Sequence, residues 1–296
     1  MILDSLKSIL LDPPPGMAFE VSEAGIAAAR IGGSRTELDF QALKPGVLSI
    51  SPLKENVIDE VEFAAAIKAL AATHTSRKGK DAALILPDFS TRTTVLDFDS
   101  FPTDVDEQLA LIRFRLKRSV PFDVESAAVS YWAQAGAKRL DVVVVMTPLE
   151  IVSRFEAPFR AAGLNPGLVT TSSLAALELA PESGLSMVAK VSGRSLTLLV
   201  RDKGALKLVR CLELPSQELA DITAVLAPTF VYMEDNLGGR AEKLLLCGFG
   251  SRADEAQRVF HDELDVEVEQ MRSPLGVPGE HNAGLLGYLR SVARNN

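Results

Sequence analysis

The alternation of short apolar runs with helix-spaced apolar residues predicts an α/β protein. Residues 17–31 (MAFEVSEAGIAAARI) predict a hairpin that turns near Glu23, Ala24 and Gly25, and 46–53 (GVLSISPL) predict a third strand. Helical spacing runs over 59–75, and again over 104–119, where acids at the start and bases at the end suit the helix dipole. Apolar or alternating runs then predict strands at 82–88, 91–99, 125–136 and 139–148 and a helix at 149–164. This helix is expected to end at Gly163, with a kink or early break at Pro158.

The second half starts again in the same way. Residues 186–214 predict a three-stranded meander with a turn at Lys203 and Gly204, and 216–237 predict one long helix. The remaining elements are a strand at 242–251, a helix at 252–264, a strand at 265–271 and a helix at 279–293. Two related α/β halves that each open on a meander indicate an actin-like architecture. A dinucleotide-binding sheet is the competing fold, but no G-x-G-x-x-G follows the first strand.

Composition and charge narrow the function. The 296 residues carry a formal net charge of -8, which argues against a general nucleic-acid binder. The dense basic cluster comprises Arg113, Arg115, Lys117 and Arg118, interpreted as a solvated helix face, with an acidic partner or lipid headgroup as the alternative. Two cysteines fit a reducing compartment, and no Cys or His spacing resembles a metal site.

The start of the chain is amphipathic. Ile2, Leu3, Leu6, Ile9 and Leu10 share one helical face and three prolines follow them, which predicts a short helix docked on its own domain; a weak membrane or partner contact is the alternative. This stretch does not resemble a signal peptide, and no apolar run approaches the ~18–20 residues of a membrane span.

An ordered set of motifs carries a family resemblance. The stretches are LILPDFSTRTTVLDFDSFP at 84–102, RFRLKRSVPFDVESAAVSYWA at 113–133, VVVVMTPLEIVSRFEAPFRAAGLNPGLVTTSSLAALEL at 142–179 and NAGLLGYLRS at 282–291. In this order they resemble the PilM family, the cytoplasmic actin-like proteins of type IV pilus assembly, and their relative, the cytoplasmic domain of the type II secretion L protein. The resemblance covers most of residues 17–290.

The resemblance implies a two-lobed actin-like (ribonuclease H-like) fold with an inserted 1C-type subdomain. The expected first lobe, 1A, comprises residues 1–90, 141–180 and 275–296. The 1C-like insertion comprises 91–140, and the second lobe, 181–274, is 2A with a truncated 2B. Residues 215–242 leave room for little more than one helix, so the 2B subdomain is expected to be reduced.

The resemblance also implies a partner. In the family, the groove between 1A and 1C binds a short N-terminal cytoplasmic peptide of the membrane protein PilN. The matching positions are Arg92, Arg115, Arg118, Pro121 and Phe122. Pro121 breaks the helix, and Phe122 is expected chiefly to anchor the next strand in the 1C core rather than to touch the partner. The membrane is expected to be reached only through the partner. Self-association stays open because relatives of this fold polymerise.

The nucleotide site of the family is degraded in this sequence. Where the first phosphate turn has Asp-Ile-Gly, this chain has Glu20 and Ser22, with Glu23 in the turn, and an extra carboxylate repels phosphate. The second turn has Lys190, Ser192, Gly193 and Arg194, and the adenosine motif has Gly248, Phe249 and Gly250. Lys190 and Arg194 suit anions but cannot hold magnesium as a carboxylate does. Phe249 is expected to fill or stack on the purine space.

These features favour a non-catalytic scaffold over an enzyme. We expect no catalytic residue, no metal and no cofactor. The alternative is an ATPase of the same machine that binds ATP and magnesium at a non-standard site, with Glu20 or Glu23 replacing the usual acid. A sugar-kinase-like transferase is a further alternative, but no acidic residue stands in a distinguishing motif.

Overall fold

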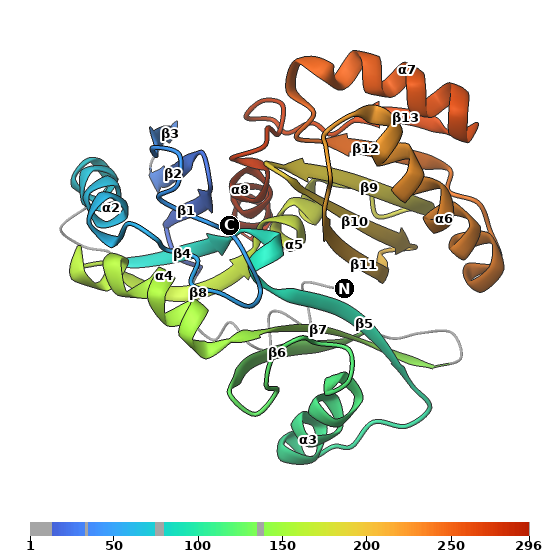
Figure 1. The fold of residues 1–296 in the computed structure, drawn as a ribbon, viewed down its shortest axis with the longest axis horizontal. Helices are drawn as coiled ribbons and strands as arrows, with labels where there is room; N and C mark the ends of the chain where they lie inside the picture. The colour runs from blue at the N-terminus through green and yellow to red at the C-terminus, as the bar shows by residue number, and fades with distance from the viewer. Residues whose placement is uncertain (1–13, 33–34, 75–79, 135–138, 296) are drawn as a thin grey trace. The chain divides into compact units, whose positions relative to one another are not determined.

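The computed structural model describes residues 14–32, 35–74, 80–134 and 139–295 (Figure 1). The amphipathic stretch expected at residues 2–10 lies outside them. The chain divides into two compact units, one up to Ser172 and one from Ser173 onward.

The main sheet of the first unit has the strand order β3-β2-β1-β4-β8. Its strands are β1 (Met17–Ser22), β2 (Gly25–Gly32), β3 (Arg35–Ala42), β4 (Asp81–Leu86) and β8 (Asn165–Thr171). β1, β2 and β3 form an antiparallel meander, and β4 and β8 add parallel to β1. The predicted hairpin is confirmed, with Glu23 and Ala24 as its two-residue turn.

The third meander strand differs from the prediction at 46–53. It is β3, whereas in the predicted stretch only Leu48 makes an isolated bridge, to Val57. β3 is an edge strand, and Leu38 and Phe40 are exposed on it. Residues 37–42 (ELDFQA) do alternate polar and apolar side chains, so a strand could be predicted there; the prediction falls instead on the denser apolar run at 46–53.

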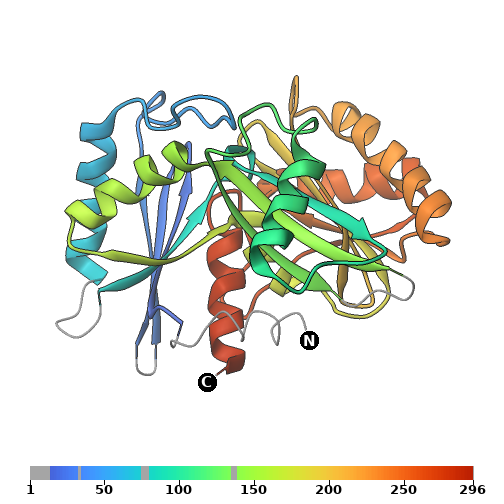
Figure 2. The ribbon, with the colours of Figure 1, turned by 90° about the horizontal axis from the view of Figure 1, so that it is seen from below.

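Helices α2 (Glu60–His74) and α4 (Leu149–Ala161) cover one face of this sheet, as Figure 2 shows. Their contact is aromatic: the rings of Phe63 and Phe155 meet edge-to-face at 6.1 Å, and Phe159 packs on Phe19 at 5.2 Å. Pro158 falls in the last turn of α4, so the helix continues past it to Ala161.

A smaller sheet of the first unit has the order β5-β7-β6. It comprises β5 (Arg92–Phe98), β6 (Ala127–Gln134) and β7 (Leu140–Pro148), and α3 (Val105–Leu116) packs on it through Ile112 and Leu116. Asp104 caps α3, since its side chain accepts hydrogen bonds from the backbone N–H groups of Asp106 and Glu107. β7, which the expected lobe boundaries place in the first lobe, is the central strand of this small sheet.

The second unit repeats the topology of the first, with the strand order β11-β10-β9-β12-β13. Its strands are β9 (Leu185–Ser192), β10 (Ser195–Asp202), β11 (Ala205–Glu213), β12 (Lys243–Cys247) and β13 (Glu267–Gln270). Again an antiparallel meander is followed by two parallel strands. The repeated meander, predicted from sequence, is therefore confirmed as a repeated sheet.

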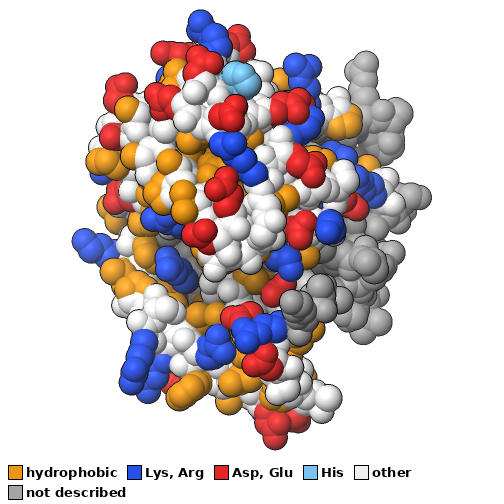
Figure 3. All heavy atoms as spheres, turned by 90° about the vertical axis from the view of Figure 1, so that its right-hand side faces the viewer, with side chains coloured by type: hydrophobic (Ala, Val, Ile, Leu, Met, Phe, Trp, Pro, Cys, Tyr) orange, Lys and Arg blue, Asp and Glu red, His pale blue; other side chains and the backbone are white. Residues whose placement is uncertain are grey.

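Two helices cover one face of the second sheet. α6 (Leu219–Leu237) and α7 (Ala253–Leu264) pack through Ile222, Leu226, Phe260 and neighbouring residues. α6 is the only helix between β11 and β12, which confirms the single long helix predicted there. Acidic, basic and hydrophobic side chains are interspersed over the face drawn in Figure 3.

The last helix, α8 (Ala283–Asn295), packs on the segment that opens the second unit. A side chain at Gly287 would lie 2.0 Å from the carbonyl oxygen of Ala175 in α5 (Ser172–Ala176), so the two backbones need this glycine. Buried Arg201 donates to the carbonyls of Ala180 and Pro181 at 3.4 Å. Burial raises the pKa of the Glu178 carboxyl, which Arg201 and Arg294 partly oppose. No described helix is long and apolar enough to cross a membrane.

Candidate functional site

In the first turn of the predicted nucleotide site, the polar side chains form hydrogen bonds with other residues of the first unit. Glu20 lies in β1 and is 2% exposed, and its carboxylate accepts a hydrogen bond from the hydroxyl of Ser172. The Ser22 hydroxyl donates to the carbonyl of Gly25 at 2.9 Å, and the Glu23 carboxylate accepts from the backbone N–H of Ile50 at 3.1 Å. Each predicted side chain of this turn therefore has a partner in the chain itself.

Gly25 closes the same turn against β3. A side chain at Gly25 would lie 2.5 Å from the ring of Phe40 and 2.4 Å from the carbonyl oxygen of Gln41. The glycine is needed for packing between strands, and this contact explains it without a phosphate.

The second turn, between β9 and β10, is filled by a segment from the end of the chain. Ser192 donates its hydroxyl proton to the carbonyl of Glu280 at 3.0 Å, and the backbone N–H of Gly193 donates to the Glu280 carboxylate at 3.3 Å. The Gln217 side chain donates to the carbonyl of Gly193. Gly193 adopts φ 54°, the left-handed conformation that aims backbone N–H groups at an anion. The anion at this turn is a carboxylate of the chain.

Lys190 and Arg194 are the two cationic residues predicted beside this turn. Lys190 lies within β9 and is 1% exposed. Arg194 pairs with Glu213 at 3.3 Å on the surface. Lys190 is therefore buried, whereas the Arg194 side chain is 70% exposed and paired with Glu213.

The predicted adenosine motif follows β12 and belongs to the packing of the second unit. Gly248 has φ 80°, and a side chain there would lie 2.1 Å from the carbonyl oxygen of Val191. Phe249 is 4% exposed, and its ring meets that of Phe260 edge-to-face at 5.8 Å in the core. Gly250 adopts φ 55° at the start of the following turn. Phe249 therefore packs inside the second unit, with little of its ring exposed.

These residues do not fit magnesium and a nucleotide phosphate. The N–H at Gly193 is used by a carboxylate, which would have to leave before a phosphate entered, because two anions repel each other. In the part of the chain that the structure describes, no group of three or more His, Cys, Asp or Glu side chains is placed to hold a metal ion.

The predicted partner residues lie on the small sheet and its helix. Arg115 lies 3.7 Å from Asp97, and its guanidinium stacks on the ring of Phe98 at 5.2 Å. Arg118 and Pro121 are exposed just after α3. Phe122 is half-buried and packs against the small core that includes Ile112 and Leu116 of α3.

Arg92 is not beside Arg115. It is exposed at the first position of β5, five residues before Asp97 in the same strand. At ~3.3 Å per residue this separation is about 16 Å. The structure therefore brings Arg115 and Phe122 to one small core and leaves Arg92 at the other end of the strand.

Four residues of these sites were missed from the sequence: Ser172, Gln217, Arg252 and Glu280. Arg252 donates to the carbonyl of Gln217, which itself holds Gly193, and Glu280 lies 87 residues beyond Gly193. No local pattern marks such contacts, because each joins segments that are far apart in the chain.

Comparison with known proteins identifies the fold. No protein-family model matches the chain, and no curated protein matches it. A solved structure of a PilM-PilN type IV pilus biogenesis complex matches with TM-score 0.79 and 18% identity, over 95% of this chain and 99% of that chain. The cytoplasmic domain of EpsL, an inner membrane component of the Vibrio cholerae type II secretion system, matches with TM-score 0.53 and 14% identity, over 95% and 94%.

A Bacteroides thetaiotaomicron protein with an actin-like ATPase fold and unknown function matches with TM-score 0.50 and 14% identity, over 86% of this chain and 90% of that one. At such low sequence identities, the structural similarity establishes the fold alone. The chain has an actin-like ATPase fold of the kind found in the PilM-PilN complex and in the EpsL cytoplasmic domain, as the ordered motifs predicted.

Proposed function

We propose that the chain is a non-catalytic, actin-like scaffold in the inner-membrane assembly platform of a type IV pilus or a related secretion system. It binds the N-terminal cytoplasmic peptide of a PilN-like bitopic membrane protein. Through that partner it is held at the cytoplasmic face of the inner membrane, and it does not hydrolyse ATP.

One observation carries the proposal: the actin-like fold is kept while a carboxylate of the chain itself occupies the second phosphate turn. The likeness to the PilM-PilN structure extends over 99% of that chain, which supports a partner of the PilN kind. At the same time the Gly193 N–H holds the Glu280 carboxylate, and Phe249 is in the core. A protein that has the actin-like fold, but whose phosphate-binding turn is occupied by its own carboxylate, is suited to binding a partner protein rather than to hydrolysing ATP.

The small sheet supplies the surface for the partner peptide. Arg115 and Arg118 are exposed in and just after α3, Phe122 packs against the core beneath it, and Arg92 is exposed at the other end of β5. Charged side chains at the rim of a groove orient a peptide, and apolar contacts supply most of its affinity.

The first test is a titration of the full chain with magnesium-ATP, followed by calorimetry and thermal denaturation. A ligand that binds only the folded state stabilises it by RT ln(1 + [L]/Kd), so even a millimolar site shifts the melting temperature at several millimolar ATP. We expect no heat of binding and no shift. Saturable binding would contradict the proposal, and loss of turnover in Glu20→Gln or Glu23→Gln would then support the ATPase alternative.

The second test measures binding of the partner peptide. A synthetic peptide with the N-terminal sequence of the PilN-like protein from the same genome should bind the full chain, and Arg115→Ala should weaken it. Arg194→Ala, at a surface ion pair of the second unit, is the matched control. A folded protein that does not bind this peptide would refute the partner assignment.

A further inference from the structure

We propose that one flank of α3 pairs with the same flank of a second copy of the chain, with the two helices antiparallel. The flank comprises Asp106, Leu109, Ala110, Arg113, Phe114 and Lys117. It uses none of the predicted nucleotide or partner residues, so the inference goes beyond the proposed function and stands without it.

These six residues line one groove of about 410 Å³, whose other wall is the chain at Val124 and Glu125. They recur at spacings of three and four residues, which places them on a single flank of the helix. The flank continues to Lys117, because its backbone keeps the helical conformation and its N–H donates to the carbonyl of Arg113 at 2.9 Å. The groove therefore contains side chains that are neighbours in space.

The middle of this flank is apolar and open to solvent. Phe114 is 76% exposed, Ala110 is exposed and Leu109 is half-buried. The core of the small sheet takes Ile112 and Leu116 from another side of α3 and includes none of these three. Figure 1 shows α3 on the outer side of the small sheet, with no other described helix of the first unit beside it. An exposed ring beside a groove gains free energy when a partner removes water from it.

The two ends of the flank carry opposite charges. Asp106 lies in the first turn of α3, and Lys117 follows its last residue. Within the described residues neither side chain forms an ion pair or a hydrogen bond. Eleven positions of helix separate them by about 16 Å, so they cannot pair with each other. Arg113, which lies between them, already faces the Glu125 carboxylate at 3.9 Å.

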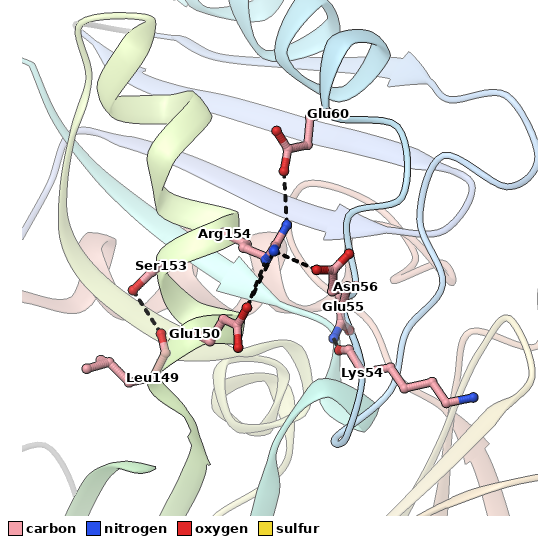
Figure 4. Close-up of polar contacts among 8 residues, drawn as sticks. All are labelled: Lys54, Glu55, Asn56, Glu60, Leu149, Glu150, Ser153 and Arg154. Carbon is pink, nitrogen blue, oxygen red and sulfur yellow. Dashed lines mark hydrogen bonds and ion pairs between the residues drawn. The ribbon is translucent and has the colours of Figure 1, made fainter. Parts of the chain in front are cut away.

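The Arg154 network of the same unit shows the contrast. Its guanidinium lies 2.5 Å from the Glu55 carboxylate, 3.0 Å from that of Glu60 and 3.4 Å from that of Glu150. Figure 4 shows these carboxylates converging on Arg154 from the loop at 51–57, from α2 and from α4. That network is closed within one chain, whereas the two charges at the ends of the α3 flank have no such partners.

The order of residues along the flank selects a second copy as the occupant. Reversing this order pairs an acid with a base and one apolar side chain with another. In an antiparallel pair of helices, Asp106 faces Lys117 of the second copy, and Leu109 faces its Phe114. Two-fold symmetry makes each contact twice, and the small Ala110 near the crossing point lets the helices approach. An acidic peptide or an anionic membrane would satisfy Lys117 and leave Asp106 unpaired.

The contact between the two copies is small. A single pair of helices lies at the low end of the size range of protein interfaces, so we expect a weak dimer with a dissociation constant on the order of 100 µM. The test is sedimentation velocity of the full chain from about 5 to 500 µM, at low and at high salt. The dimer fraction should rise with concentration and fall with salt. A chain that stays monomeric over this range would overturn the proposal.

Variants of exposed residues test the pairing itself. Phe114→Ser should weaken the dimer about 10-fold or more. Asp106→Lys and Lys117→Glu should each abolish it, because each places like charges opposite one another twice. An equimolar mixture of these two charge variants should associate again, since every facing pair then has opposite charges. The circular dichroism of each variant should match that of the parent, because the changed side chains are exposed.

Lys54→Glu is the matched control. It makes the same change of charge as Lys117→Glu, at an exposed lysine that extends away from the Arg154 network in Figure 4, and it should dimerise like the parent. Loss of the dimer in this control, or a mixture of the two charge variants that stays monomeric, would overturn the proposal. Binding of the parent to phosphatidylglycerol vesicles that Phe114→Ser abolishes would also overturn it, since the flank would then belong to a membrane contact.

Discussion

Replacing Phe249 by Ala separates the two roles considered for this residue. If the ring stacked on a purine, its loss would weaken nucleotide binding and leave stability nearly unchanged. The structure instead buries it to 4% exposure against Phe260, among the residues that hold α6 and α7 on the second sheet. The substitution should therefore destabilise the second unit.

The expected magnitude follows from the burial. Truncation of a buried phenylalanine to alanine costs about 3–5 kcal/mol, from the lost transfer free energy and the cavity that remains. At roughly 4 °C per kcal/mol for a unit of about this size, the melting temperature should fall by about 12–20 °C. Phe249→Leu keeps most of the volume and should cost about 1.5 kcal/mol or less.

The assay is urea unfolding followed by far-ultraviolet circular dichroism, which reports helices of both units. Trp132, the only tryptophan, lies in β6 of the first unit, so its fluorescence reports that unit. Phe114→Ala is the control, because its side chain is 76% exposed and its removal should change stability by less than about 0.5 kcal/mol. An unfolding midpoint of Phe249→Ala equal to that of the parent would refute the packing argument.

Three further predictions test other elements. Gly248→Ala should lower the urea midpoint strongly, because the new methyl would lie 2.1 Å from the carbonyl oxygen of Val191 at φ 80°; parent-like stability would refute this close approach. Asp104→Ala should cost about 1 kcal/mol in the same assay through loss of the α3 cap, and an unchanged midpoint would refute the cap. Glu178 has a raised pKa in the folded state, so its contribution to stability is full below its ordinary pKa of 4.5 and is lost as pH rises through the folded value. The stability of the parent relative to Glu178→Gln should therefore fall as pH rises from 4.5, and a difference that is constant with pH would contradict the assignment.

Most elements of the fold could be predicted because their patterns are local. The meander at 186–214, the helix at 216–237 and the basic helix around 104–119 each bury one face, and burial imposes a period of two or 3.6 residues on the sequence. The turn at Lys203 and Gly204 follows from conformations that few residues adopt. The repeat of one pattern in both halves indicated an actin-like architecture beside a competing dinucleotide-binding sheet, and the ordered motifs favoured the actin-like fold.

The third meander strand shows the limit of this reasoning. β3 lies at the edge of the sheet with Leu38 and Phe40 exposed, and the prediction favours the denser apolar run at 46–53 over its alternating sequence at 37–42. It is a strand because it pairs with β2 along its whole length. The apolar residues at 46–50, which look more like a strand, instead fill the core beneath α2.

By itself the sequence determined the two repeated halves, their helices and the loss of the usual residues at the phosphate turns. Only the tertiary structure decided what those residues do instead: Glu280 holds Gly193, Phe249 packs in the core, and Arg154 gathers three carboxylates. The physical reason is the separation along the chain of the residues that make these contacts. Periodicity records which face of a segment is buried, whereas these contacts join segments up to 99 residues apart, as between Glu55 and Arg154, and depend on where the sheets and helices bring them.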